Sequence, residues 1–253
     1  MNIAILGIGL MGFPMGRRLC EAGHTVHVWN RSNHKALRLE SFGALVHDTP
    51  ANAVAEADLV ITMLDNGAVV GHVLFDLGAA AAMRADCLVI DMSSIKPAEA
   101  RDHAARLSER HIAYLDAPVS GGTIGAESGS LAIMVGGKLS HFERAFPVLQ
   151  LLGRPTLVGP TGTGQLTKLA NQMIVGATIG VVAEALLLCE RGGAHMDKVR
   201  EAITGGFADS RILQVHGQRM VERDFSPRGR MSIQLKDLRN ALATAKEIGF
   251  EAP

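Results

Sequence analysis

The sequence of 253 residues predicts an α/β protein in which a doubly wound parallel sheet is followed by an all-α region. Short apolar segments alternate with helical patterns over the first two thirds of the chain, which is typical of such a sheet. After residue 165 the strand pattern stops and only helical patterns follow. We therefore predict two domains, one over residues 1–162 and a helical one over residues 163–253.

The predicted strands are, in chain order, NIAILG, HTVHVWN, DLVITML, CLVIDMS, IAYLDAP and LAIMVGG. Each is short and apolar, and the helical patterns between them favour strands joined by crossover helices. Those patterns lie at about 11–22, from Ser32, near 67–83 and from Pro97. The all-α region contains the later helical patterns, at about 165–190, 195–204, 210–222 and 231–248.

Charge and cysteine content exclude several classes of protein. Lys plus Arg is 25 and Asp plus Glu is 25, so there is no basic surplus and nucleic acid is not an expected partner. The three cysteines, Cys20, Cys87 and Cys189, fit no metal spacing and predict reduced thiols. The N-terminus lacks the basic segment of a signal peptide. We therefore expect a cytoplasmic protein without a metal site.

One long apolar segment resembles a membrane span. It begins after Lys168 and runs to Glu184 without another charge, which is shorter than the roughly 20 residues of a span. Asn171, Gln172 and Thr178 interrupt it. We predict a helix buried inside a protein, and no membrane partner.

A glycine-rich turn follows the first strand and opens a helix. Its glycines are Gly7, Gly9 and Gly12, with Leu10 and Met11 between the last two, in the pattern G-x-G-x-x-G. These glycines allow a tight turn, close approach to a pyrophosphate and close helix–strand packing, and the helix start attracts the phosphates. Because the turn lies inside a βαβ unit, it predicts a Rossmann-type dinucleotide site.

The end of the second strand selects the cofactor. It reads Asn30, Arg31, Ser32 and has no acidic residue to bind the ribose hydroxyl of NAD. Arg31 can pair with the 2′-phosphate of NADP, so we expect NADP(H) to be preferred and NAD(H) to remain possible. The alternative is that Arg31 is a solvated surface residue.

Later strand ends add to the expected site. Met63 and Leu64, and then Ser93 and Ser94, follow strands whose carboxyl ends line the same crevice, although ordinary strand ends would look the same. The segment DAPVSGG places Ser120, Gly121 and Gly122 after another strand. A hydroxyl and accessible N–H groups suit a small carboxylate, and a plain glycine turn is the alternative.

Lys168 is the candidate proton donor. Burial lowers the pKa of a lysine, and such a lysine can protonate a carbonyl oxygen while hydride reaches its carbon. Asn171 and Gln172, at i+3 and i+4, lie on the same helix face and are expected to orient the lysine or hold a substrate hydroxyl. The alternative is a lysine that extends to the surface from a helix start.

The segments GIGLMGFPM, DAPVSGG, GTGQLTKLANQ and QLKDLRNA together resemble the β-hydroxyacid dehydrogenase family, over essentially the whole chain. The resemblance implies that Lys168 is catalytic, that Asn171 is its neighbour at the substrate, and that residues 120–122 hold the substrate carboxylate. It also implies that Lys236, with Asp237 beside it, closes over the nicotinamide. A homodimer or homotetramer is expected.

Within the family, VIDMSSI, DAPVSGG and TKLANQMIV are most similar to the branch that reduces 2-hydroxy-3-oxopropanoate (tartronate semialdehyde) to glycerate with NAD(P)H. The alternatives are a 3-hydroxyisobutyrate dehydrogenase and a glyoxylate or succinic semialdehyde reductase. An imine reductase and a non-catalytic NADP-binding scaffold are less well supported, because both would be expected to lose Lys168 or the carboxylate loop.

Two features depart from the family pattern. The decarboxylating branch has an acid two turns beyond the lysine, whereas this chain has Val175, so we expect hydride transfer without decarboxylation. Family members usually continue with further helices beyond the residue corresponding to Pro253, so we expect a C-terminally shortened helical domain.

Overall fold

The computed structural model describes residues 1–226 and 231–251. These residues belong to two compact units, Met1–Lys168 and Leu169–Pro253. The domain boundary predicted from the sequence, between residues 162 and 163, remains a prediction, since the division into units comes later, inside a helix.

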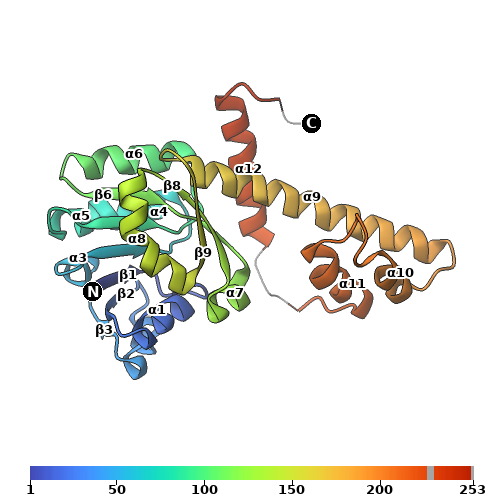
Figure 1. Cartoon of the computed structure of the whole chain (residues 1–253), viewed down its shortest axis with the longest axis horizontal. Helices are drawn as coiled ribbons and strands as arrows, with labels where there is room; N and C mark the ends of the chain where they lie inside the picture. The colour runs from blue at the N-terminus through green and yellow to red at the C-terminus, as the bar shows by residue number, and fades with distance from the viewer. Residues whose placement is uncertain (227–230, 252–253) are drawn as a thin grey trace. The chain divides into compact units, whose positions relative to one another are not determined.

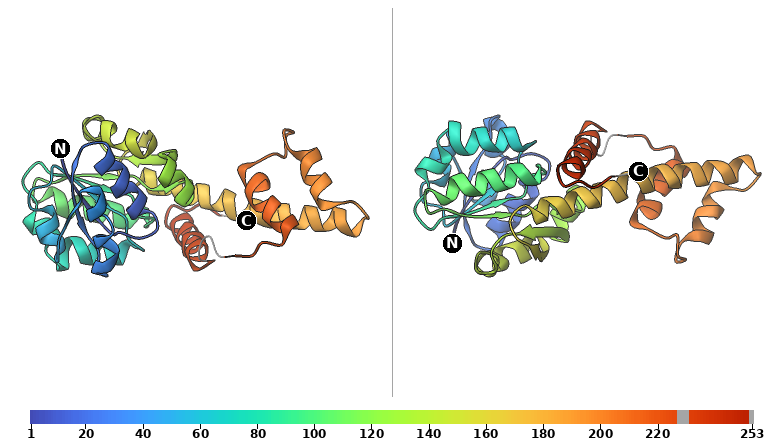
Figure 2. Two further views of the ribbon diagram at one scale, coloured as in Figure 1. Left: turned by 90° about the horizontal axis from the view of Figure 1, so that it is seen from below. Right: turned by 90° about the horizontal axis from the view of Figure 1, so that it is seen from above.

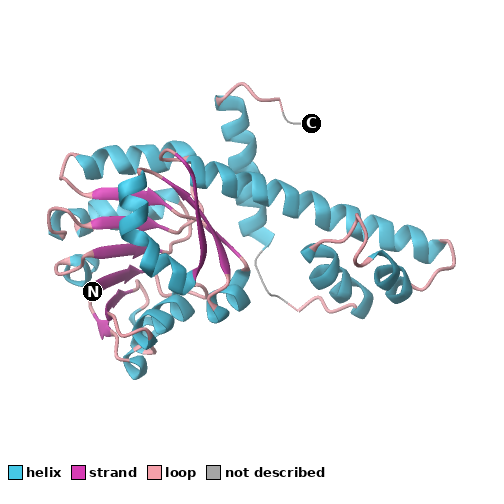
Figure 3. Cartoon of the chain, in the orientation of Figure 1, coloured by secondary structure: helices cyan, strands magenta, loops and turns pink. Residues whose placement is uncertain are grey.

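A nine-stranded sheet forms the centre of the first unit (Figures 1 and 3). Its strands are β1 (Asn2–Leu6), β2 (Thr25–Trp29), β3 (Leu45–Val46), β4 (Leu59–Thr62), β5 (Leu88–Asp91), β6 (Ala113–Asp116), β7 (Val119–Ser120), β8 (Leu131–Gly136) and β9 (Gly153–Gly159). The order is β3-β2-β1-β4-β5-β6-β8-β7, with β9 also paired to β8. The chain adds β2 and β3 on one side of β1 and then β4, β5 and β6 on the other, which is the strand order of a doubly wound sheet.

Six strands of this sheet, β1 to β6, pair in parallel, which confirms the predicted fold class. The register places Ile3 beside Val26 on one side and Leu59 on the other. The segment LAIMVGG differs from the expectation, because β8 runs antiparallel to β6 with Asp116 opposite Gly136. The chain between them stays at the carboxyl edge of β6, so β8 returns in the opposite direction.

Helices cover both faces of the sheet, as the two views in Figure 2 show. They are α1 (Gly12–Glu21), α2 (Asn33–Leu37), η1 (Glu40–Phe42), α3 (Pro50–Val54), α4 (Gly67–Gly71), η2 (His72–Asp76), α5 (Ala79–Ala82), α6 (Pro97–Ser108), α7 (Gly122–Ser128) and α8 (Leu139–Leu152). Neighbouring residues of β1 enter two separate cores. Ile3 and Ile5 pack into one, and Ala4 and Leu6 into the other. Both faces of the strand are therefore buried, which explains its unbroken apolar sequence.

The second unit consists of helices in its described residues, as predicted. They are the continuation of α9 (Thr163–Arg191), then α10 (Met196–Ile203), η3 (Leu213–Gly217), α11 (Gln218–Glu222) and α12 (Met231–Glu247). A small core of Val182, Leu186 and Leu213 joins α9 to the segment that precedes α11.

Burial of α9 differs from the prediction. Ile174, Val181 and Leu188 are more than 60% exposed in this chain, whereas the sequence predicted a helix buried inside the protein. The composition of a helix reveals that it is apolar but not what packs against it. Among the described helices, α9 alone is long and apolar enough to cross a membrane, which is a finding about its length and composition only.

Candidate active site

The glycine-rich turn lies between β1 and α1 and has the shape that a dinucleotide site needs. Gly7 has a φ of +111°, and a Cβ there would overlap the carbonyl oxygen of Met63. A Cβ at Gly12 would overlap the carbonyl oxygen of Gly7, so α1 packs directly on the turn. At Gly9 a Cβ would meet no protein atom within 4 Å. The space over Gly9 is therefore open to a pyrophosphate, and the residues present fit the cofactor.

Asn30 joins this turn to the end of β2. Its Oδ1 accepts a hydrogen bond from the Ile8 N–H at 2.9 Å, and its Nδ2 donates to the Ser32 carbonyl at 3.0 Å. Arg31, between Asn30 and Ser32, is exposed, and Leu10 at the tip of the glycine turn is 76% exposed. The structure thus holds the predicted phosphate turn and the predicted cofactor-selecting segment in one hydrogen-bonded arrangement.

The ends of β4 and β5 meet beside the glycine turn. A Cβ at Gly7 would lie 3.0 Å from a Leu64 methyl carbon, and the Leu64 N–H donates to Ser93 Oγ at 3.0 Å. Met63, Leu64 and the segment that holds Ser94 therefore gather at the edge where a dinucleotide is expected. Ser93 belongs to the strand end, Ser93–Ser94, that the sequence placed at this crevice, and its Oγ makes this contact.

The predicted carboxylate loop starts at β7. Ser120 is half-buried, while Gly121 and Gly122 are exposed and have φ values of +137° and +62°. Other residues would be strained at these φ values, which glycine adopts freely, and the absence of side chains leaves the backbone of both residues uncovered. The loop has the accessibility that binding of a small carboxylate requires.

Lys168 lies in the second turn of α9 and is 9% exposed. A lysine whose pKa is lowered for proton transfer was predicted to be buried, and Lys168 is buried. The alternative, a lysine that extends to the surface, is wrong. Because a cation is costly to bury, this position favours a group with a chemical task.

Two buried residues missed as site residues hold the first turn of α9. The Asp116 carboxylate accepts hydrogen bonds from the N–H groups of Gly162 at 2.7 Å and Gln165 at 2.8 Å. The Gln165 side chain accepts from the Ile95 N–H at 3.0 Å and donates to the Ser93 carbonyl at 2.8 Å. Asp116 and Gln165 occur in the segments DAPVSGG and GTGQLTKLANQ, so their place in those motifs was the available signal.

Asp116 has an unusual titration. Burial raises the pKa of its carboxyl group to about 6, while the N–H donors of Gly162 and Gln165 act in the opposite direction. The unfolded chain would bind the same proton with a pKa of about 4. The folded state therefore binds it more tightly, and the stability due to Asp116 is present at low pH and lost as pH rises through about 6.

We expect this contribution to disappear in Asp116→Asn. The difference in unfolding free energy, wild type minus variant, should fall as pH rises from about 4 to about 7, because only the wild type releases a proton in that range. Urea denaturation at several pH values measures this difference. A difference that grows with pH would show that the folded protein prefers the ionised carboxylate, and a constant difference would show that folding leaves this pKa unshifted.

In the second unit, several predicted residues share one hydrogen-bond network. Asn171 donates to Gln172 Oε1 at 2.9 Å, and Gln172 Nε2 donates to Asp237 Oδ2 at 2.8 Å. Asp237 is 1% exposed, and its other oxygen is paired with the Lys236 ammonium at 3.2 Å. Gln234 also bonds to Gln172, and it was not predicted. The network joins α9 to α12 and ties Asn171 and Gln172 to the residues from the QLKDLRNA segment.

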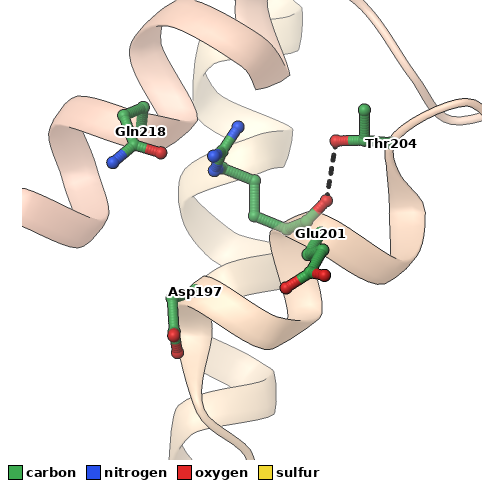
Figure 4. A pocket seen from close by; sticks show the side chains of 5 residues that line it. Asp197, Glu201, Thr204 and Gln218 are labelled. Atoms are coloured by element: carbon green, nitrogen blue, oxygen red, sulfur yellow. Dashed lines mark hydrogen bonds between the residues drawn. The ribbon is translucent and has the colours of Figure 1, made fainter.

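A hollow of about 420 Å³ lies within the second unit and contains none of the predicted site residues (Figure 4). Its lining residues come from α10 and α11 and the turn between them, and they are Asp197, Arg200, Glu201, Thr204 and Gln218. Acidic and basic groups are mixed there, so no single class of ligand is indicated. Among the residues that the structure describes, no cluster of three His, Cys, Asp or Glu side chains has the arrangement of a metal site.

Comparison with known proteins agrees with this arrangement. The family described as the NAD binding domain of 6-phosphogluconate dehydrogenase matches residues 2–164. The family described as the NAD-binding of NADP-dependent 3-hydroxyisobutyrate dehydrogenase matches residues 162–253. Together these two families cover almost every residue of the chain.

Individual relatives extend over the same length. A 2-hydroxy-3-oxopropionate reductase of Escherichia coli (strain K12) is 43% identical over all of this chain and 87% of its own. A probable 3-hydroxyisobutyrate dehydrogenase of Mycobacterium bovis is 37% identical, over 100% of this chain and 88% of its own. The solved structure of Mycobacterium tuberculosis 3-hydroxyisobutyrate dehydrogenase with L-serine superposes with a TM-score of 0.92 at 35% identity, covering 100% of this chain and 89% of that one.

The nucleotide turn, the buried lysine and these matches lead to one assignment. The chain belongs to the β-hydroxyacid dehydrogenases, which are NAD(P)-dependent oxidoreductases that act on the CH–OH group of small hydroxyacids.

Proposed function

We propose that this protein is an NADP(H)-dependent reductase that converts tartronate semialdehyde to glycerate. The observation that carries the proposal is the buried Lys168, on the helix that follows an open nucleotide turn and an accessible carboxylate loop. The 43% identity with the Escherichia coli 2-hydroxy-3-oxopropionate reductase supports this choice of substrate. A 3-hydroxyisobutyrate dehydrogenase is the second candidate, favoured by the similarity to the mycobacterial structure.

The first unit contains most of the residues that we assign to the cofactor. The glycine turn, from Gly7 to Gly12 with Leu10 and Met11, would bind the pyrophosphate. Asn30 would hold this turn beside Arg31 and Ser32 through its two hydrogen bonds. Arg31 would pair with the 2′-phosphate. The further contacts that we assign are Met63, Leu64, Ser94 and Lys236. When bound, NADPH supplies the hydride.

Lys168 performs the proton transfer in this proposal. Ser120 and the N–H groups of Gly121 and Gly122 bind the substrate carboxylate, which orients the aldehyde. The Lys168 ammonium donates a proton to the carbonyl oxygen as the carbonyl carbon is reduced, and it then recovers a proton from water. Asn171 and Gln172 follow Lys168 by three and four residues on the same helix and would orient it or bind a substrate hydroxyl.

Reduction would proceed without loss of carbon dioxide. Val175 stands where the decarboxylating enzymes of this family have an acid, and valine cannot protonate an enediol. We also propose a homodimer or homotetramer, since the exposed apolar residues of α9, among them Ile174 and Leu188, need cover from water. The cytoplasm is the proposed location, because the three cysteines fit reduced thiols. Light scattering that reports a monomer would contradict this assembly.

Arg31→Leu should reverse the preference for cofactor. Loss of a charge-assisted pair with the 2′-phosphate costs about 1.5–3 kcal/mol, so kcat/KM for NADPH should fall roughly tenfold or more. The value for NADH should change little, because that cofactor has no phosphate there. Equal losses with both cofactors would show that Arg31 maintains the loop and does not read the phosphate.

The substrate assignment is tested by NADPH oxidation in parallel assays of the purified protein. The four candidates are tartronate semialdehyde, glyoxylate, succinic semialdehyde and methylmalonate semialdehyde. We expect the highest kcat/KM with tartronate semialdehyde. A higher value with methylmalonate semialdehyde would support the 3-hydroxyisobutyrate dehydrogenase, and a higher value with either of the others would name a different reductase.

A further inference from the structure

We propose that Gln165 is a positioning residue that couples the Lys168 helix to the cofactor-binding edge of the sheet, through its bonds to the backbone of residues 93–95. This inference rests on the proposed function and deepens it. It concerns residues of the first unit only.

Gln165 is fully buried and makes two hydrogen bonds to one short backbone segment. Its Oε1 accepts from the Ile95 N–H at 3.0 Å, and its Nε2 donates to the Ser93 carbonyl at 2.8 Å. A buried amide is costly unless both its ends are paired, and here both are. Of the side chains of this length, only glutamine offers an acceptor and a donor together at neutral pH.

The segment that Gln165 holds is itself tied to the proposed cofactor edge. Ser93 Oγ accepts the Leu64 N–H at 3.0 Å, and the Ser93 N–H donates to Asp91 Oδ1 at 3.0 Å. Ser94, a proposed cofactor contact, lies between the two residues that Gln165 binds. A movement of this segment when NADPH binds would therefore reach α9 through the Gln165 side chain.

The first turn of α9 is also fixed by contacts with β6 and β8. Asp116 holds the N–H groups of Gly162 and Gln165, and a Cβ at Gly164 would overlap the Met134 carbonyl oxygen. Gly164 of the GTGQ segment is therefore required by close packing on β6 and β8. The Gln165 side chain connects this fixed turn to residues 93–95 by hydrogen bonds.

Lys168 follows Gln165 by three residues, which places the two about one helical turn apart. Proton transfer depends on placement of the donor to within roughly 0.5 Å. Loss of the Gln165 hydrogen bonds should therefore displace Lys168 and lower kcat, while cofactor affinity stays almost unchanged. A residue that only stabilised the fold would not separate these two quantities.

Gln165→Glu and Gln165→Met form a matched pair of tests. The introduced carboxylate keeps the acceptor for the Ile95 N–H but cannot donate to the Ser93 carbonyl until it is protonated. At about pH 8 we expect kcat to be lower than wild type by roughly 10- to 50-fold in both variants, with the NADPH Kd within about threefold.

As pH falls to about 6, kcat of Gln165→Glu relative to wild type should recover, while that of Gln165→Met should not. Asp116, Asp91, Lys168 and Arg101, whose guanidinium lies beside Gly162, are ionisable groups near this turn, and they are common to all three proteins. Parallel pH profiles for the two variants, or a loss confined to KM, would overturn the inference.

Hydrogen exchange measures the coupling without catalysis. In wild type, NADPH should slow amide exchange both in residues 93–95 and in residues 163–168. In Gln165→Met the first effect should remain and the second should be lost. Absence of any NADPH effect at residues 163–168 of wild type, or its survival in the variant, would contradict the coupling. Failure of the proposed function would appear separately, as a wild type that shows this exchange pattern but reduces no semialdehyde.

Discussion

Lys168→Ala is expected to lower kcat by roughly two to four orders of magnitude while the NADPH Kd stays within a few-fold of wild type. The lysine is the proposed proton donor, and alanine has no group that can replace it. Lys168 is also buried, so its removal leaves a small cavity and no new charge. Tryptophan-to-NADPH energy transfer gives the Kd, and steady-state assays with tartronate semialdehyde give kcat.

Lys198→Ala is the matched control. Lys198 is exposed and pairs with Glu201 on the surface of α10, so its replacement should leave kcat unchanged. If Lys168→Ala kept more than about a tenth of wild-type kcat, general acid catalysis by this lysine would be refuted. In that case the chain would be a cofactor-binding scaffold or would use another proton donor.

Gly9→Ala is expected to weaken NADPH binding by roughly 100-fold or more and to leave the unfolding temperature unchanged. The open space at Gly9 means that a methyl group meets no protein atom, so the fold should accept it. The same methyl group would occupy the path by which the pyrophosphate approaches the backbone. Loss of two charge-assisted bonds, at about 1.5–3 kcal/mol each, accounts for the expected size of the effect.

Gly12→Ala separates the two roles of these glycines. Its methyl group would overlap the Gly7 carbonyl, so both stability and NADPH affinity should fall. Calorimetry with and without NADPH measures both quantities. If Gly9→Ala bound NADPH as tightly as wild type, the pyrophosphate could not lie over this turn.

Much of the fold was predictable, because it depends on local patterns. The apolar segments that became β1, β2, β4, β5, β6 and β8 were recognised, as were the helices after residue 163. β3 and β7 have two residues each, which is too short for a pattern, and β9 contains Pro155. The antiparallel direction of β8 depends on the path of the connecting chain and not on the composition of the strand.

The candidate site was predictable where its chemistry lies in short motifs, and less so where it depends on contacts between distant residues. The glycine turn and Lys168 are recognisable within a few residues of sequence. Asp116 and Gln165 act on partners 46 and 72 residues away, so only the fold reveals their bonds. The exposure of α9 was missed for a related reason, since composition does not tell which surfaces a helix covers.

Product analysis is the measurement that tests the proposed activity most directly. The purified protein is incubated with NADPH and tartronate semialdehyde, and glycerate, carbon dioxide and oxidised cofactor are quantified together. We expect glycerate and NADP in equal amounts, no carbon dioxide, and almost no product with Lys168→Ala. A protein that binds NADPH but forms no glycerate, and reduces none of the other three semialdehydes, would contradict the assignment.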